Sequence, residues 1–257
     1  MSVGQVDPQQ VASIIREVAA EEILTRFRHL SAGQIREKKP GELVTEADIE
    51  AERVLTRRLA DLIPGARVVG EEAVSADHRL LQALDNEGIV WVIDPVDGTA
   101  NFAKGNARFA VIVALVRDGV TVAGWILDPT TDRLIIAQQG SGAWEGDNRL
   151  RVLPPAPLAD LTGSVKRSGL LSSLVAKIGR KGSAAHDYID LVTGVLHFAH
   201  YNRLMPWDHA AGVLIHAEAG GYAALTDGRP YRPRAEPGCL LLAPSAGTWT
   251  SLQAIID

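Results

Sequence analysis

Apolar residues recur with helical spacing in two stretches near the N-terminus. The spacing of Val11, Ile15 and Val18 continues far enough to predict an amphipathic helix over residues 7–30. A second apolar face predicts a helix over residues 45–62, and the Pro-Gly pair that follows would end it. The chain is therefore expected to begin with two helices.

Short apolar runs replace this pattern in the middle of the chain. The segment "ARVVGEE" is predicted to be a short strand that ends at Gly70, and "GIVWVIDP" a buried strand. Residues 109–144 then form consecutive runs, with turn signals at Asp118-Gly119 and at "DPTTD", 128–132. Turns of this kind favour antiparallel pairing of neighbouring strands.

The proline-rich stretch "RVLPPAPLAD" marks the expected connection between two halves, about 1–153 and about 154–257. Beyond it the pattern predicts a helix near 184–196, a strand near 197–204, a helix near 208–219, and strands near 222–225 and 239–243. The predicted order is helices first, then a meander of strands, then alternating helices and strands. This order indicates mixed α/β layers with a largely antiparallel sheet.

Composition narrows the classes of protein to consider. The 257-residue chain suits one large domain or two small ones. Its formal net charge of -5 argues against a nucleic-acid partner bound through a basic face. The longest plain apolar run, 109–116, is far shorter than the roughly 20 residues of a membrane helix, so no membrane partner is expected. Cys239 is the only cysteine, which excludes a disulfide framework and fits a reducing, cytoplasmic location.

The segment "WVIDPVDGTANF", residues 91–102, places two carboxylates three positions apart at the end of the buried strand. Pro95 cannot donate to a sheet ladder, so regular pairing is expected to stop there, and a turn would bring Asp94 and Asp97 towards one point. Two close, partly buried carboxylates stay ionised only with a positive charge between them. A hard divalent cation such as Mg²⁺ is the simplest candidate.

Gly98 and Thr99 follow, where a helix is expected to begin. Thr99 is a good N-cap residue, and the free backbone N–H groups of a helix start suit a phosphate group. Metal ligands beside an anion site are what metal-assisted phosphate hydrolysis requires. The alternative interpretation is a plain turn, because Asp, Pro and Gly are the usual turn formers.

Three further acidic stretches each allow a functional and a structural interpretation. Glu71 and Glu72 end another strand and would otherwise be solvated surface residues. Asp208, in "WDHAAG", begins a helix and would otherwise be its N-cap. Asp48 follows Thr45 by three residues in "VTEAD", which also fits a capping box.

Together, four stretches resemble the inositol monophosphatase family, which belongs to a wider class of Mg²⁺-dependent, lithium-sensitive phosphatases. They are "LVTEAD" at 43–48, "GEE" at 70–72, "WVIDPVDGTANF" at 91–102 and "WDHAAG" at 207–212. Their order and spacing match the family from about residue 10 to 245. The resemblance implies a homodimer of single domains, 1–257, with an α/β (α+β) fold: the layered αβαβα sandwich of the inositol monophosphatase and fructose-1,6-bisphosphatase type.

The resemblance also assigns roles to individual residues. Glu71, Asp94 and the backbone carbonyl of Val96 would hold one Mg²⁺. Asp94, Asp97 and Asp208 would hold a second, and Asp48 would reach a third, weaker ion through water. The catalytic residues would be Glu71, Thr99 and Asp48, which position and activate the attacking water. The substrate would be contacted by Gly98, Thr99 and Ala100 at its phosphate oxygens and also by Asp208.

The substrate end departs from the family pattern. The stretch "GSAAHDYIDL" carries His186 and Asp187 where inositol phosphatases are largely apolar, and "HFAHYNRLMPWD" lacks the family's inositol-binding glutamate. His186, Asp187 and Arg203 would form a pocket for a different leaving group, with Arg203 suited to a second anionic group. The alternatives are a structural His186–Asp187 pair and a surface Arg203.

The expected function is that of a hydrolase, a Mg²⁺-dependent phosphomonoesterase with two or three bound ions. Its substrate would be a small phosphorylated metabolite, either inositol monophosphate or a related polyol or sugar phosphate, attacked in line by water. Within the class, 3′-phosphoadenosine phosphate, fructose 1,6-bisphosphate and histidinol phosphate are alternative substrates. The alternative from another class is a regulatory binding protein that acts through a partner such as RNA polymerase. The intact set of site residues favours catalysis, since a scaffold need not keep carboxylates that repel one another.

Overall fold

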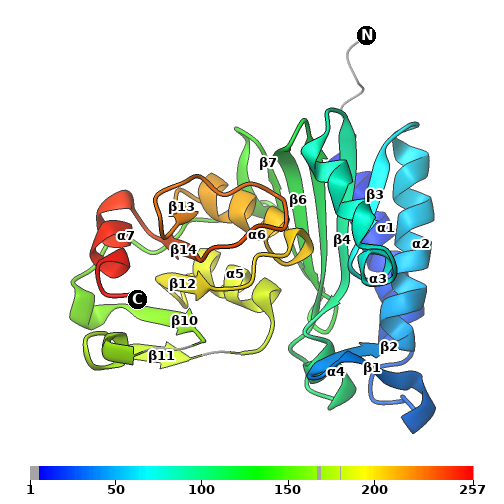
Figure 1. The fold of residues 1–257 in the computed structure, drawn as a ribbon, viewed down its shortest axis with the longest axis horizontal. Coiled ribbons are helices and arrows are strands. Elements are labelled where there is room, and N and C mark those ends of the chain that lie inside the picture. Colours follow the sequence, from blue (N-terminus) through cyan, green and yellow to red (C-terminus); the bar gives the residue numbers. More distant parts are fainter. Residues whose placement is uncertain (1–5, 167–168, 180, 257) are drawn as a thin grey trace.

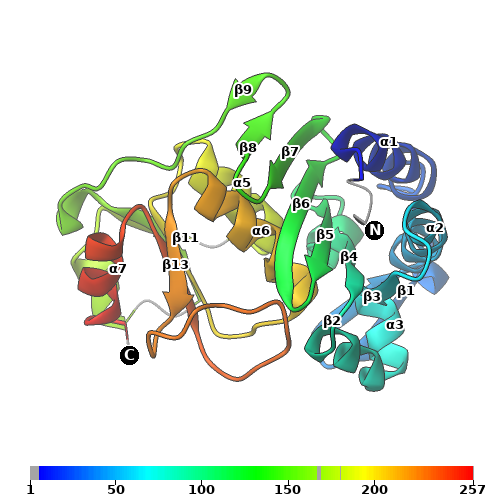
Figure 2. The ribbon, with the colours of Figure 1, turned by 90° about the horizontal axis from the view of Figure 1, so that it is seen from above.

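The structure, a computed structural model, describes residues 6–166, 169–179 and 181–256. Its main helices are α1 (Pro8–Val18), α2 (Glu46–Leu62), α5 (Ala184–Val192), α6 (Pro206–Glu218) and α7 (Ala246–Gln253). Helices and sheets alternate in layers (Figures 1 and 2): α1 with α2, a large sheet, α5 with α6, a smaller sheet, and α7. This order confirms the layered αβαβα sandwich.

The large sheet is a meander with one parallel edge. Its strands are, in spatial order, β3 (Arg67–Gly70), β4 (Ile89–Asp97), β5 (Ala110–Arg117), β6 (Val120–Asp128), β7 (Arg133–Gln138), β8 (Gly142–Glu145) and β9 (Asn148–Arg149). β3 runs parallel to β4, and each later pair is antiparallel. The predicted meander is confirmed, and the turn between β5 and β6 has positive φ at both Asp118 and Gly119, as a two-residue hairpin turn requires.

Both faces of the large sheet are buried, which explains its nearly continuous apolar runs. Trp91 and Trp125 belong to the cluster that packs on α1 and α2. Val92, Ile112 and Ile126 belong to the cluster that packs on α5 and α6. Because successive strand residues point to opposite faces, each strand supplies both clusters in turn.

The first predicted helix, over residues 7–30, begins as expected but ends earlier, at Leu24, and differs in form. α1 ends at Val18, and a π-helical turn, Ala19–Leu24, continues it. Val18 and Ile23 are fully buried and five residues apart, a spacing that fits the wider π-helical turn better than an α-helical one. α2 confirms the second predicted helix, with its start one residue later than expected.

The smaller sheet lies in the C-terminal half. Its strands are, in spatial order, β11 (Lys177–Gly179), β10 (Thr162–Val165), β12 (Phe198–Tyr201), β14 (Leu240–Ala243) and β13 (Tyr222–Leu225). The predicted strands near 197–204, 222–225 and 239–243 are confirmed as β12, β13 and β14, whereas β10, β11 and α7 were not predicted. The predicted helix near 184–196 stops sooner, because Gly194 adopts a positive φ just past its end.

Short elements complete the fold and support the site. β1 (Ile35–Lys39) and β2 (Glu42–Thr45) pair as a hairpin across "REKKPGELV", where only a helix break was predicted. The remaining short helices are α3 (Glu71–Ala76), α4 (Thr99–Ala103) and the 3₁₀ segments Ala32–Gln34, His78–Asp85, Leu158–Asp160 and Gly169–Ser173. Within the described ranges, no helix combines the length and apolar character that crossing a membrane requires.

Candidate active site

β4 carries the "WVIDPVDGTANF" motif and continues past Pro95. Asp94 pairs with Ile112 of β5, and Asp97 pairs with Ala110, so three steps along β4 match two along β5. This one-residue bulge accommodates a proline, which has no N–H to give to the ladder. The prediction that pairing stops at Pro95 is therefore wrong. The extra residue also restores a common face to two positions that a regular strand would point in opposite directions.

Glu71, Asp94 and Asp208 lie together although they come from three different elements. Each offers a carboxylate oxygen, and these oxygens lie within 4.8 Å of one another. Glu71 is the first residue of α3, directly after β3. Asp208 is the third residue of α6, so the alternative interpretation of it as an N-cap is wrong. A donor set made of carboxylate oxygens suits a hard divalent cation such as Mg²⁺.

Like charges crowd this cluster. Burial raises the pKa of Asp94 well above its usual value, and the charges of Glu71 and Asp97 raise it further. Burial raises the pKa of Asp208 in the same way, again with contributions from Glu71 and Asp97. A divalent cation would offset both the repulsion and the lost hydration of these carboxylates, so the residues present fit the predicted metal.

Asp48 is buried in the first turn of α2 and faces the site. Its Oδ2 accepts hydrogen bonds from the backbone N–H of Thr45 at 2.8 Å and from the Thr45 hydroxyl at 2.5 Å, so the predicted capping box is present. Its Oδ1 accepts a hydrogen bond from the Thr99 hydroxyl at 3.0 Å. Burial raises the pKa of Asp48 to about 7, although the Thr45 bonds lower it. A carboxyl group with this pKa can take up or release a proton near neutral pH.

Gly98, and not Thr99 as predicted, is the N-cap of the five-residue helix α4. Gly98 has a φ of 93°, and a Cβ atom there would lie 2.7 Å from the carbonyl oxygen of Arg108, so the position requires glycine. The Thr99 hydroxyl instead lies 3.0 Å from Asp48 Oδ1 and 3.0 Å from the carbonyl oxygen of Val96. Thr99 is therefore turned towards the site and away from its own helix start.

Asp97 is held by the N-terminus of α5. Its Oδ1 accepts a hydrogen bond from the backbone N–H of Ala184 at 3.1 Å. Its Oδ2 accepts from the N–H of Ala185 at 2.8 Å and from the hydroxyl of Ser183. These hydrogen bonds fix the orientation of the Asp97 carboxylate before any metal binds. They also connect the β4 bulge to α5, in the C-terminal half of the chain.

Lys38, on β1, has no role in the sequence prediction but contacts the acidic cluster. Its ammonium donates to Glu71 Oε1 at 2.8 Å and to Glu72 Oε1 at 2.9 Å, and its side chain is only 11% exposed. Burial lowers the pKa of Lys38, but the charges and hydrogen bonds of Glu71 and Glu72 outweigh burial and raise it above the usual value. Lys38 therefore stays charged and balances part of the negative charge. Both glutamates are part of this network and are not simply solvated surface residues.

Glu52, also absent from the prediction, orients the start of α3. Its carboxylate on α2 accepts hydrogen bonds from the backbone N–H groups of Glu72 at 2.8 Å and Ala73 at 2.7 Å. A Cβ atom on Gly70 would lie 2.3 Å from the Glu52 carboxyl carbon, which explains the glycine in "GEE". Burial raises the pKa of Glu52 to about 7. Glu52 thereby fixes the first turn of α3, which begins with Glu71.

Replacing Glu52 with Gln is expected to weaken both stability and activity. The amide group keeps one acceptor oxygen but presents N–H groups where the second backbone donor needs an acceptor. One unsatisfied buried N–H costs about 1–3 kcal/mol. We expect a fall of about that size in the free energy of unfolding, measured with urea, and a lower kcat from a displaced Glu71.

Glu50→Gln is the matched control for this prediction. Glu50 lies on the same helix, and its ion pair with Arg53 is at the surface. Such pairs contribute little, so the change in the free energy of unfolding should stay within about 0.5 kcal/mol. Equal behaviour of the two variants would show that Glu52 does not orient α3.

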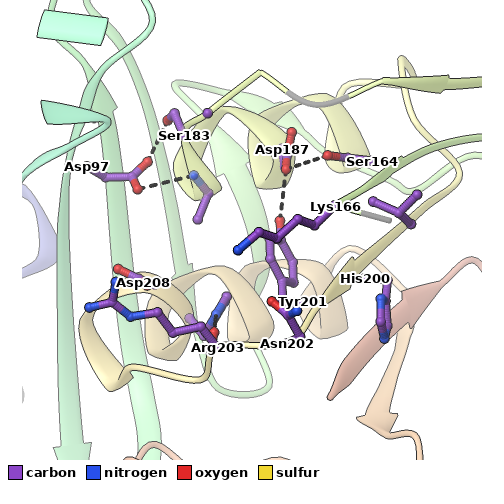
Figure 3. Close-up of a pocket in the computed structure, with 14 residues that line it drawn as sticks. Asp97, Ser164, Lys166, Ser183, Asp187, His200, Tyr201, Asn202, Arg203 and Asp208 are labelled. Carbon is purple, nitrogen blue, oxygen red and sulfur yellow. Dashed lines mark hydrogen bonds between the residues drawn. The ribbon is translucent and has the colours of Figure 1, made fainter. Parts of the chain in front are cut away.

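A cavity opens beside the acidic cluster, on the side of the smaller sheet (Figure 3). Asp97 and Asp208 are among its lining residues. Asp187 is buried in its wall, where Oδ2 accepts hydrogen bonds from Ser164 at 2.7 Å and Tyr201 at 3.3 Å. Its Oδ1 has no hydrogen-bond partner within the described part of the chain. Burial raises the pKa of Asp187 to about 6.

Two cationic side chains reach the same cavity. Arg203 lies 2.6 Å, by its guanidinium, from Glu42 Oε1 on β2, and it is 55% exposed. Lys166, which the prediction omits, follows β10 and extends across the cavity towards Asp97 and Asp208 (Figure 3). The only sequence signal for Lys166 is a basic residue directly after a strand, and that signal is too common to be useful.

His186 lies behind Ser183 and not on the cavity wall. Its Nδ1 is 2.9 Å from the Ser183 hydroxyl oxygen, and its Nε2 is 3.6 Å from Asp128 Oδ2. Asp187 contacts Ser164 and Tyr201, so His186 and Asp187 have separate partners and the alternative of a His186–Asp187 pair is wrong. A direct substrate contact by His186 stays a prediction.

Residues 7–256 match the model of the inositol monophosphatase family. The chain belongs to the inositol monophosphatase family. An inositol-1-monophosphatase of Bacillus subtilis is 30% identical over 230 residues, which is 84% of this chain and 84% of that protein. The Nus factor SuhB of Vibrio cholerae is 35% identical over 211 residues, 76% of this chain and 75% of that protein.

Solved structures of inositol monophosphatases have the same fold. An IMPase from Thermotoga maritima matches with a TM-score of 0.81 at 26% identity, over 95% of this chain and 94% of that chain. The resemblance inferred from the four motifs is thus confirmed, and this chain is a phosphatase, a hydrolase, of the inositol monophosphatase family. The family is metal-dependent, typically with Mg²⁺, which agrees with the acidic cluster.

Proposed function

We propose that this member of the inositol monophosphatase family is a Mg²⁺-dependent phosphomonoesterase acting on a small phosphorylated metabolite. The observation that carries the proposal is the convergence of Glu71, Asp94 and Asp208, from three elements, to within 4.8 Å. Without cations, repulsion among the ionised carboxylates destabilises such a cluster. With cations bound, the same carboxylates hold the ions that metal-assisted phosphate hydrolysis requires. The other residues of the site surround this cluster with proton acceptors, backbone donors and a polar cavity.

The donor set divides naturally between two ions. Glu71, Asp94 and the Val96 carbonyl would hold one Mg²⁺, and Asp94, Asp97 and Asp208 would hold a second; Asp48 would reach a third through water. When bound, Mg²⁺ neutralises charge on a phosphate group and makes water more acidic. Lys38 would keep Glu71 in place through its hydrogen bond.

Asp48 and Thr99 are suited to move a proton. The Thr99 hydroxyl donates to Asp48 Oδ1, which leaves the hydroxyl oxygen able to accept a hydrogen bond from a water molecule. A proton taken by the hydroxyl can pass to Asp48 Oδ1, since this carboxyl group has a pKa of about 7. Glu71 would help to orient the same water molecule.

The start of α4 would receive the phosphate group. The first N–H groups of a helix have no intrahelical acceptor. Gly98, Thr99 and Ala100 form this start, and Gly98 lets the backbone turn there with a positive φ. Their N–H groups would therefore contact phosphate oxygens beside the metal ligands.

The leaving group would occupy the cavity of Figure 3. Asp187, which lines this cavity, would contact the leaving group there. Lys166 and Arg203 would favour a leaving group with a second negative charge, which is why inositol 1-phosphate is not the only substrate to consider. The family also implies a homodimer, which a sedimentation measurement would test.

A substrate panel tests the proposal. Phosphate release would be measured with Mg²⁺, with and without lithium, from inositol 1-phosphate, fructose 1,6-bisphosphate, 3′-phosphoadenosine phosphate and histidinol phosphate. We expect lithium-sensitive turnover, with one substrate preferred about a hundredfold or more in kcat/KM. Lack of turnover with every phosphate ester would contradict the proposal.

Lys166→Met should lower kcat/KM for a substrate with two anionic groups by about ten- to a hundredfold. A charge-assisted hydrogen bond contributes about 1.5–3 kcal/mol, and 1.36 kcal/mol corresponds to a tenfold change. A monophosphate should be affected less. Lys177→Met, an exposed lysine on β11 away from the cavity, is the control. Equal losses for both kinds of substrate would contradict a role for Lys166 in selectivity.

A second candidate function is regulatory binding to a macromolecular partner. It is favoured by one observation, the 35% identity to a protein named Nus factor SuhB. In that case capture of RNA polymerase should survive Asp94→Asn, because the partner would bind the surface and not the acidic cluster. Loss of capture together with loss of activity would argue against an independent regulatory role.

A further inference from the structure

A row of polar side chains in contact with one another runs from Asp97 into the protein interior. Ser183, the N-cap of α5, donates its hydroxyl hydrogen to Asp97 Oδ2. Nδ1 of His186 lies 2.9 Å from the Ser183 oxygen, and Nε2 on the far side of the ring lies 3.6 Å from Asp128 Oδ2. The row therefore connects the end of β6, the first turn of α5 and the bulge of β4.

The hydrogens in this row have a defined direction when Asp97 is ionised. A carboxylate can only accept, so the single hydroxyl hydrogen of Ser183 points to Asp97. The Ser183 oxygen must then accept from His186, which places a hydrogen on Nδ1. With its hydrogen on Nδ1, the imidazole donates to the Ser183 oxygen and so favours the orientation in which the hydroxyl hydrogen points to Asp97.

Asp128 fixes the imidazole from its other side. Oδ1 of Asp128 accepts hydrogen bonds from the backbone N–H of Thr130 at 2.9 Å and its hydroxyl at 2.7 Å, and Oδ2 accepts from the Thr131 hydroxyl at 2.9 Å. Burial opposes ionisation of Asp128, but the nearby His186 ring and the hydrogen bonds from Thr130 and Thr131 lower its pKa to about 2. The side chains of His186 and Asp128 are only 9% and 11% exposed, so little water competes for their contact.

The contacts of the row restrict which oxygen lone pairs of Asp97 stay available to a cation. A carboxylate has roughly four lone-pair directions. The N–H groups of Ala184 and Ala185 and the Ser183 hydroxyl use three of them. The remaining direction stays fixed only while the hydroxyl points to Asp97.

We propose that His186 and Asp128 are positioning residues, which hold Ser183 so that Asp97 keeps one oxygen lone pair directed to the metal site. The inference rests on the proposed function in one respect, the role of Asp97 as a metal ligand. In this proposal His186, an unexpected polar residue of "GSAAHDYIDL", has a role that does not involve contact with the substrate. Residues that orient ligands in this way commonly change metal affinity by about 10–100-fold when replaced.

The test compares metal binding in variants that keep or break the row. His186→Leu removes both ring contacts, whereas His186→Asn keeps an N–H near the Nδ1 position and loses only the reach to Asp128. Asp128→Asn keeps the shape but removes the charge. Binding of Mn²⁺, as a spectroscopic substitute for Mg²⁺, would be measured without substrate by electron paramagnetic resonance of the free ion.

We expect His186→Leu to weaken Mn²⁺ binding at one site by about tenfold or more, with His186→Asn and Asp128→Asn intermediate. At saturating Mg²⁺, kcat should return close to the wild-type value, because the reacting groups are intact. His216→Leu is the matched control. His216 is a fully buried histidine on α6 whose ring nitrogens have no partner in the described part of the chain. Its replacement should change thermal stability and leave Mn²⁺ binding unaltered.

Each outcome separates this inference from the proposed function. Wild-type protein that binds no Mn²⁺ and has no Mg²⁺-dependent activity would overturn both. Wild-type protein that binds Mn²⁺, with His186→Leu binding it equally well, would overturn the positioning role alone. If His186→Leu does not fold, the affinities of His186→Asn and Asp128→Asn decide the matter in the same way.

Discussion

Asp94→Asn should leave a folded protein whose kcat/KM is lower by about a thousandfold or more. Asp94 is the one side chain proposed to contact both ions, and metal ions supply several kcal/mol of transition-state stabilisation. A loss of about 4 kcal/mol corresponds to roughly three powers of ten. The fold should persist, because asparagine keeps an oxygen to accept the hydrogen bond that Val96 N–H gives to Asp94 Oδ1 at 3.0 Å. Steady-state phosphate release and circular dichroism would measure the two effects.

The same variant should be more stable than the wild type when metal is absent. Burial and nearby charges raise the pKa of Asp94 in the folded state. An acid whose folded-state pKa is raised loses stability as the pH rises above its unfolded value, about 3.9. Asparagine cannot ionise, so the gain in Tm should be largest at neutral pH and shrink as the pH falls towards that value. Exposed Asp61 is the control, since Asp61→Asn should change neither Tm nor activity.

Much of the site could be predicted because its ligands are concentrated in short segments. Asp94, Asp97 and Thr99 fall within six residues, and their spacing restricts what the backbone can do. Even there the prediction was wrong about local form. Pro95 produces a bulge, and it is the bulge that gives both carboxylates a common face. A sequence pattern shows that pairing must change at proline, but the choice between a bulge and a strand end depends on β5, which lies further along the chain.

The residues that support these ligands could not be predicted from local pattern. Glu52 binds the start of α3 from 20 residues upstream, and Lys38 reaches Glu71 across 33 residues. Ser183 contacts Asp97 across 86 residues. Each is a common residue type in an unremarkable context, and only the packing of α2, β1 and α5 around β4 gives it a partner.

At the substrate end, too, the sequence shows which residues are unusual but not which surroundings each of them has in the fold. The sequence marks His186, Asp187 and Arg203 as unusual for the family, but not what each one faces. In the structure Asp187 is in the cavity wall, Arg203 joins the β1–β2 hairpin, and His186 turns to Asp128. Neighbouring positions on one helix turn thus face different surroundings, because α5 lies between the large sheet and the smaller one.

Adding Mg²⁺ to metal-free protein should raise Tm by about 5–10 °C. Binding to the folded state alone stabilises a protein by about 2.7 kcal/mol at one hundred times Kd. For a chain of this size each kcal/mol corresponds to about 2–4 °C. The physical source would be the acidic cluster, where the cation offsets the repulsion that raises the pKa values of Asp94 and Asp208. Thermal unfolding in EDTA and in Mg²⁺ would measure the shift, and activity should disappear and return in parallel.

Two controls separate ion binding from general screening of charge. Sodium chloride at matched ionic strength weakens repulsion between exposed carboxylates but has less effect on Asp94, which is 1% exposed. It should therefore reproduce only a small part of the shift. Asp208→Asn removes one ligand and should abolish most of the Mg²⁺ effect while raising Tm in EDTA. Full activity in EDTA, or an equal shift with sodium chloride, would contradict a metal site at Glu71, Asp94 and Asp208, whereas the expected pattern would place the stabilisation at these carboxylates.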